Sequence, residues 1–112
     1  MIWNYNKKQN DQFSKAAFDV AEDLWEVTAD DLTARDRRQL VVKMRTILIS
    51  LLADRQLSTR WVARQLKRHH ATVAYAIENH DGYLEEDSEY AQNYKAAKAK
   101  FEQICEERDL RK

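Results

Sequence analysis

The stretch RHHATVAYAI, residues 68–77, carries the side chains best suited to chemistry in this sequence. Arg68, His69 and His70 stand together, and two small residues separate them from the apolar Val73. Imidazoles can transfer protons or bind a metal ion. Guanidinium and imidazole groups at the start of a helix can instead read the edges of base pairs.

Neither catalysis nor metal binding is favoured by the spacing. Adjacent helical residues point about 100° apart, so His69 and His70 make a poor chelating pair, and His80 has no cysteine nearby. The acidic runs at 30–31 and 85–87 lack a histidine base or a nucleophile in a recognisable arrangement. We therefore expect no enzymatic activity, no cofactor and no metal. A solvated turn position is the plainer alternative for His69.

The charges cancel in total but are sorted along the chain. Residues 1–34 hold three basic and seven acidic side chains, and residues 71–112 hold six and ten. Residues 35–70 hold ten basic side chains against two acidic ones. A basic block between acidic flanks is typical of a polyanion site whose flanks suppress indiscriminate binding. The alternative is that helix surfaces are simply charged.

Length and composition favour one all-α domain in the cytoplasm. A chain of 112 residues suits a single domain, and with no proline and only Gly82 it nearly lacks helix breakers. The lone Cys105 cannot form an internal disulfide, and we find neither a signal-like start nor an apolar run of about 20 residues. We expect a compact bundle of about five helices, without a membrane segment.

Apolar periodicity divides the first half of the chain into an arm and two helices. Residues 1–10 are interpreted as an N-terminal arm, ahead of one domain over residues 11–112. A helix is predicted from about Asp11 to residue 25 or 26, then a loop or short helical turn. A central helix is predicted from Asp36, as N-cap, to Asp54. Its apolar stripe is Leu40, Val41, Met44, Ile47, Leu48, Leu51 and Leu52.

The second half predicts a helix-turn-helix and a last helix. Ser58 or Thr59 opens a short helix, a turn follows at residues 67–69, and Val73, Ala76 and Ile77 face the core from a second short helix. Gly82 should break the pattern before the final helix begins. That helix has a heptad-like seam, expected to pack within its own domain, with a partner helix or a second copy as the alternative: Tyr90, Tyr94, Ala97, Phe101 and Ile104.

Three runs carry a family resemblance: VAEDLWEVTADDL, RDRRQLVVKMRTILISLLADRQLS and RHHATVAYAI. They resemble the C-terminal DNA-binding domain of the bacterial replication initiator DnaA, whose most specific element reads R-D-H-[ST]-T-V-x-H-A. The resemblance covers roughly residues 13–104. It implies a helical bundle with a helix-turn-helix related to that of the Trp repressor, which binds short asymmetric duplex sites.

The resemblance places a basic-loop arginine, Arg37, in the minor groove. It places Lys43, Arg45 and Thr46 near phosphates, and His70 and its neighbours on a recognition helix in the major groove. The basic residues early in the central helix are expected outside its apolar stripe, and so in solvent. The predicted DNA contacts are Arg37, Arg38, Lys43, Arg45, Thr46, Ser58, Thr59, Lys67, Arg68, His69, His70, Ala71, Thr72 and Tyr75.

The sequence also departs from the family pattern. His69 stands in place of an acid, Ala71 in place of a hydroxyl residue and Tyr75 in place of a histidine, and a turn glycine is missing before Lys67. The family's usual target sequence is therefore not assumed. No GxxxxGK[ST] loop is present, so no nucleotide is expected.

We expect a sequence-specific double-stranded DNA-binding protein, nucleoid-associated and of bacterial or phage origin, that regulates replication or transcription. The alternative is a protein-interaction adaptor that retains the fold.

Overall fold

The computed structural model describes residues 7–34 and 38–110, and every regular element in these ranges is an α-helix. The predicted all-α bundle is therefore confirmed. The predicted short helical turn forms the small helix α2. The helices are α1 (Lys7–Trp25), α2 (Ala29–Thr33), α3 (Gln39–Asp54), α4 (Thr59–Leu66), α5 (His70–Glu86) and α6 (Ser88–Glu107).

Two helix starts differ from the prediction. Helix α1 begins at Lys7, ahead of the expected Asp11. The prediction missed this first turn because its residues are polar and add nothing to the apolar periodicity. Helix α3 begins at Gln39 with Arg38 at its N-cap, and the predicted cap Asp36 lies outside the described residues.

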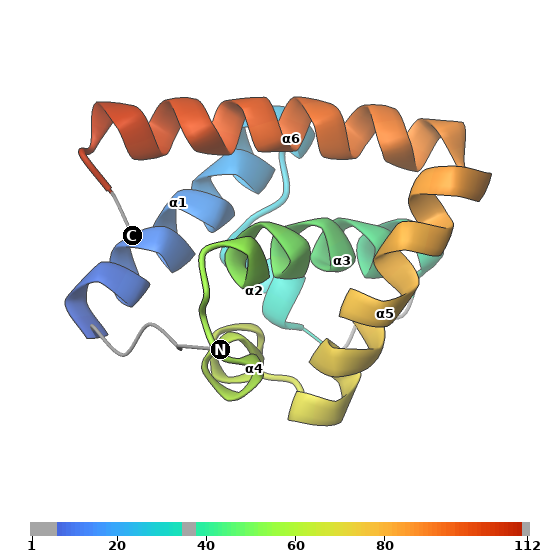
Figure 1. The fold of residues 1–112 in the computed structure, drawn as a ribbon, viewed down its shortest axis with the longest axis horizontal. Coiled ribbons are helices and arrows are strands. Elements are labelled where there is room, and N and C mark those ends of the chain that lie inside the picture. Colours follow the sequence, from blue (N-terminus) through green and yellow to red (C-terminus); the bar gives the residue numbers. More distant parts are fainter. Residues whose placement is uncertain (1–6, 35–37, 111–112) are drawn as a thin grey trace.

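Helix α3 lies at the centre of the bundle and packs against α1, α4, α5 and α6. Figure 1 shows α6 and α1 on one side of α3, α4 on the other, and α5 connecting the two sides. Most of the predicted stripe is buried, including Ile47 and Leu48. Leu40 is an exception, because 56% of its surface is exposed. It borders a small open groove between α3 and the start of α6.

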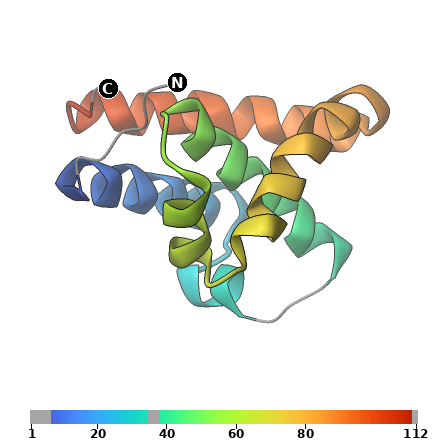
Figure 2. The same cartoon turned by 60° about the horizontal axis from the view of Figure 1, so that its bottom comes forward.

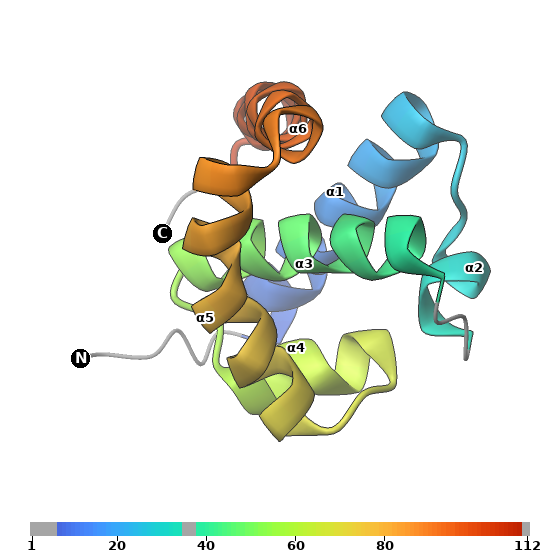
Figure 3. The same ribbon diagram turned by 90° about the vertical axis from the view of Figure 1, so that its right-hand side faces the viewer.

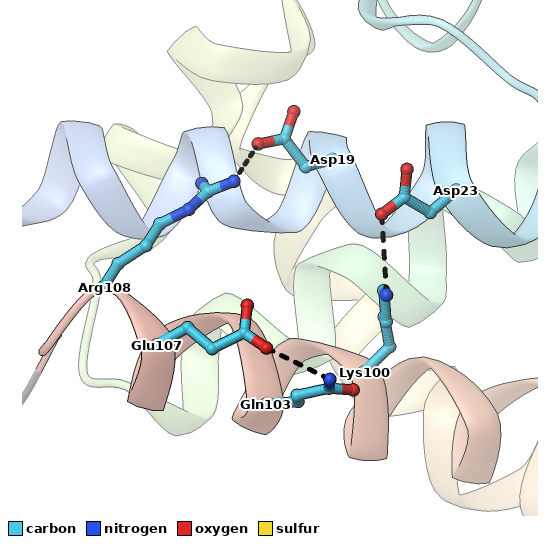
Figure 4. A network of polar contacts seen from close by, with 6 residues as sticks. All are labelled: Asp19, Asp23, Lys100, Gln103, Glu107 and Arg108. Atoms are coloured by element: carbon cyan, nitrogen blue, oxygen red, sulfur yellow. Dashed lines mark hydrogen bonds and ion pairs between the residues drawn. The ribbon is translucent and has the colours of Figure 1, made fainter.

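Helices α1 and α6 pack along each other through their apolar faces. Phe13 and Phe101 lie with their ring centroids 6.4 Å apart, and Ala97 is fully buried beside them. Two ion pairs flank this contact, Arg108 to Asp19 at 2.7 Å and Lys100 to Asp23 at 3.7 Å (Figure 4). The seam of the final helix therefore packs within its own domain, as predicted.

Within residues 7–34 and 38–110, four helices are followed within two residues by one with left-handed backbone geometry, and none of these residues is glycine. Each has φ between 55° and 70°: Glu26, Gln56, Lys67 and Asp109. The next N–H then bonds back over the helix end, as in Leu110 to Cys105 O at 2.7 Å, which satisfies a carbonyl that the helix leaves unpaired. Lys67 adopts this geometry in the turn between α4 and α5, which contains no glycine.

Helix α5 is longer than predicted, because Gly82 does not interrupt it. A Cβ added at Gly82 would meet nothing within 4 Å, so the glycine is a tolerated position in an exposed helix. The helix ends at Glu86, and the next residue, Asp87, caps α6 by accepting from the Tyr90 N–H at 3.0 Å.

Helix α5 packs across α3 (Figure 3), and Val73 is its one buried residue. Val73 is buried, whereas Ile77, predicted to face the core, is 36% exposed. Ala76 is half-buried. No helix in the described ranges is both long enough and apolar enough to cross a membrane.

Replacing Gly82 by Ala should stabilise the protein by roughly 0.5–1 kcal/mol, because alanine loses less backbone entropy on entering a helix. Urea unfolding of Gly82→Ala and wild type measures the difference. Ala99→Gly, at an exposed position of α6, is the matched control and should destabilise by a similar amount. A lower midpoint for Gly82→Ala would show that α5 does not continue through this residue.

Candidate nucleic-acid interface

Helices α4 and α5 form a helix-turn-helix whose start and turn are held by side-chain caps. The Ser58 hydroxyl accepts the Trp61 N–H at 3.1 Å and so begins α4. The His69 Nδ1 accepts the Ala71 N–H at 3.1 Å and begins α5. Only residues 67–69 separate the two helices. Ser58 is thus a helix cap, while Thr59, the first residue of α4, is half-buried.

The predicted recognition residues lie at the start of α5. Figure 2 shows this end of the helix beside α4. The rings of His69 and His70 stack with centroids 4.4 Å apart. Because His69 Nδ1 accepts a backbone N–H, its ring proton belongs on Nε2. Ala71 and Thr72 are exposed, and Tyr75 is 66% exposed. We call the side chains at this start of the helix the α5 surface: His69, His70, Ala71, Thr72 and Tyr75.

His70 is poised to act as a neutral group. Partial desolvation, assisted by the nearby positive charge of Arg60 and by His69, lowers the pKa of its imidazole below the ordinary value. At neutral pH the ring therefore carries one donor and one acceptor. Such a group can accept from an amino group of a base or donate to a purine nitrogen.

A basic fringe on α4 and the turn borders the α5 surface. Arg60, Arg64 and Lys67 are exposed. The Arg64 guanidinium lies 5.3 Å from the Trp61 ring centroid, while Trp61 packs against the core, as expected. Arg60 and Arg64 were absent from the predicted contacts. Their four-residue spacing outside the apolar positions of α4 was the signal that could have identified them.

Two predicted DNA contacts instead bind the end of α2. Arg45 is only 7% exposed, and its guanidinium donates to Leu32 O at 2.7 Å and to Ala34 O at 2.9 Å. Arg68 also donates to Ala34 O, and to Thr33 O at 3.2 Å. The carbonyls at a helix C-terminus lack intrahelical partners, and these two arginines supply the donors. The expectation that Arg45 lies in solvent is therefore wrong, and the Arg68 guanidinium is already engaged.

The remaining predicted phosphate contacts differ in their surroundings. Thr46 is buried at the wall of the groove between α3 and α5 and donates to Val42 O at 2.9 Å, an arrangement that does not favour the predicted phosphate contact. Lys43 is half-buried and paired with Asp87. Their hydrogen bond raises the pKa of Lys43 and lowers that of Asp87, which keeps both charged. Arg38 is exposed, and the predicted minor-groove residue Arg37 lies outside the described residues.

An open groove of about 610 Å³ runs between α3 and α5, and sequence reasoning did not identify it. Val42 and Ile49 line it from α3. Ala71, Thr72 and Tyr75 line it from α5. The α5 surface therefore has an apolar border on its α3 side and a basic border on its α4 side.

The histidine outside this surface has a packing role. The His80 Nδ1 lies 2.6 Å from the Tyr90 hydroxyl, and its ring is edge-on to Tyr94. Across residues 7–34 and 38–110, no group of three or more His, Cys, Asp and Glu side chains is placed to hold a metal ion. No family model, curated protein or solved structure matches this chain.

Removing the Arg45 side chain should destabilise the fold by roughly 2–4 kcal/mol, because Leu32 O loses its buried charged donor and Ala34 O loses one of its two. Urea unfolding of Arg45→Ala measures this loss. Arg45→Lys should recover only part of it, because one ammonium group cannot reproduce the fork of the guanidinium. Arg60→Ala, on the exposed face of α4, is the control and should stay within about 0.5 kcal/mol of wild type. Equal midpoints for Arg45→Ala and wild type would remove the residue from this role.

Proposed function

We propose that this protein binds double-stranded DNA, with the first two turns of α5 in the major groove and the basic residues of α4 along the phosphates. The carrying observation is that Val73 is the one buried residue among the 17 of α5. The first two turns of α5 are therefore mostly exposed, and such a helix start beside exposed arginines suits insertion into a charged groove.

The number of phosphate contacts is smaller than the basic block suggests. Arg45 and Arg68 bind carbonyls, Lys43 pairs with Asp87, and Arg55 lies 5.5 Å from the Phe13 ring centroid. The cations best placed beside the α5 surface are Arg60, Arg64 and Lys67. About three such contacts give a slope of log affinity against log salt near −2.7.

The charge along α5 limits which part of the helix meets DNA. No acidic residue occurs in its first two turns, and the first acid is Glu78. Four exposed acids follow in its second half: Glu78, Asp81, Glu85 and Glu86. Phosphates are repelled there, so the duplex approaches the N-terminal end of α5.

The resemblance to the DnaA C-terminal domain supports the same docking, since His69, His70 and Thr72 occupy its recognition-helix positions. It also motivates a role for this protein in regulating replication or transcription at the nucleoid.

A protein-interaction adaptor is the second candidate, and the apolar groove between α3 and α5 favours it. The presence of Arg45 and Arg68 at positions that resemble DNA contacts favours neither candidate function, because both side chains are needed by the carbonyls at the end of α2. Selection of bound duplexes from a random pool at near-physiological salt does separate them. An enriched motif supports DNA reading, whereas a flat pool contradicts it.

Arg60→Ala should weaken binding to all duplexes alike and make the salt slope shallower by about 0.9. Titrations of a preferred and a scrambled duplex at several salt concentrations provide the measurement. Lys98→Ala, an exposed charge on α6, should leave the slope unchanged. Wild-type slopes for Arg60→Ala would place this residue outside the phosphate contacts.

His70→Ala should cost about 1–3 kcal/mol of binding free energy on the preferred duplex and little on the scrambled one, because a base-edge contact is lost. Thermal melts of both proteins serve as the control. Equal losses on the two duplexes would mean that His70 does not read sequence. A lowered melting temperature beside them would assign the residue to the fold.

A further inference from the structure

Tyr75 is an exposed aromatic of the α5 surface, on the side that borders the groove between α3 and α5. At 66%, its exposed fraction is the highest among the large hydrophobic residues in the described ranges. Aromatic rings gain substantial free energy when they are buried, so one left in solvent beside a binding surface suggests a contact completed by a ligand.

The residues one helical turn before Tyr75 extend its apolar character. Ala71 and Thr72 precede it by four and three residues, so all three lie on one side of the helix. They line the same groove together with Ala76. The part of α5 proposed to enter the major groove thus has an apolar strip beside its histidines.

The floor of the major groove consists mainly of hydrogen-bond donors and acceptors. The C5-methyl group of thymine is its apolar feature, and alanine, threonine methyl and aromatic groups pack against it. We propose that Tyr75, with Ala71 and Thr72, selects thymine through this methyl group. The inference rests on the proposed function, since it requires α5 to lie in the major groove.

The neighbouring charges make DNA the favoured occupant of this strip. The Arg60 charge acts on His70 of the α5 surface, Arg64 lies one turn further along the same side of α4, and a polyanion is the partner that matches them. A protein partner would cover the whole groove, including Ile49 on α3. A duplex held by α4 contacts only its α5 wall.

The experiment replaces the thymines of the selected duplex by uracil, one at a time. Uracil keeps every hydrogen-bonding group of thymine and removes only the methyl group. With wild type, one or two positions should lose affinity by roughly three- to tenfold, the effect expected for burying one methyl group. Tyr75→Ala should abolish most of this thymine preference, and Tyr75→Phe should retain it, because the ring and not the hydroxyl makes the contact.

Asn79→Ala is the matched control, because Asn79 lines the same groove without an apolar side chain. It should leave the thymine-to-uracil ratio unchanged. Melting curves of all variants verify folding.

The outcomes distinguish this inference from the proposed function. An enriched motif that lacks thymine, or that tolerates uracil at every position, would overturn the role of Tyr75 while DNA binding stands. Loss of affinity for every duplex by Tyr75→Ala, with the thymine preference intact, would make the ring a backbone contact and would also overturn it. A flat selection would overturn both proposals.

Discussion

The carbonyl groups at the end of α2 constrain the whole arrangement. A helix of five residues leaves most of its carbonyls without intrahelical partners, and here Arg45 and Arg68 supply the donors. Arg45 comes from the central helix and Arg68 from the turn before α5. One cluster of hydrogen bonds therefore connects α2, the central helix and the helix-turn-helix. It holds the turn that starts α5 close to α3, and so fixes where the α5 surface lies.

Basic residues serve two purposes in this protein. Arg45 and Arg68 donate to the carbonyls at the end of α2, and Arg55 lies over the rings of Phe13 and Phe101. A count of charges in the sequence cannot separate these residues from the surface cations, because a guanidinium satisfies carbonyls as well as it meets phosphates. The basic block is therefore partly an architectural feature, and fewer of its cations are placed to contact phosphates than its total charge implies.

Periodicity predicted the features that depend on local sequence. The burial of Leu48, the end of the central helix at Asp54 and the cap at Ser58 follow from spacing and side-chain type. The burial of Arg45 could not be predicted, since it depends on α2, a separate element whose carbonyls need donors. Gly82 misled for a related reason. A glycine in an exposed helix costs only about 1 kcal/mol relative to alanine, and the packing of α5 against α3, α4 and α6 outweighs this cost.

The two halves of α5 differ in charge, and this difference determines how the proposed docking obtains its affinity. Its first turns combine neutral histidine and apolar groups with a basic fringe, and its acids begin at Glu78. Few phosphate contacts mean a weak sequence-independent attraction, which the acidic half of the helix reduces further. Affinity must then come largely from the base edges. Discrimination depends on the ratio of specific to non-specific affinity. A small basic fringe therefore favours a protein that selects its DNA sequence over one that binds every duplex tightly.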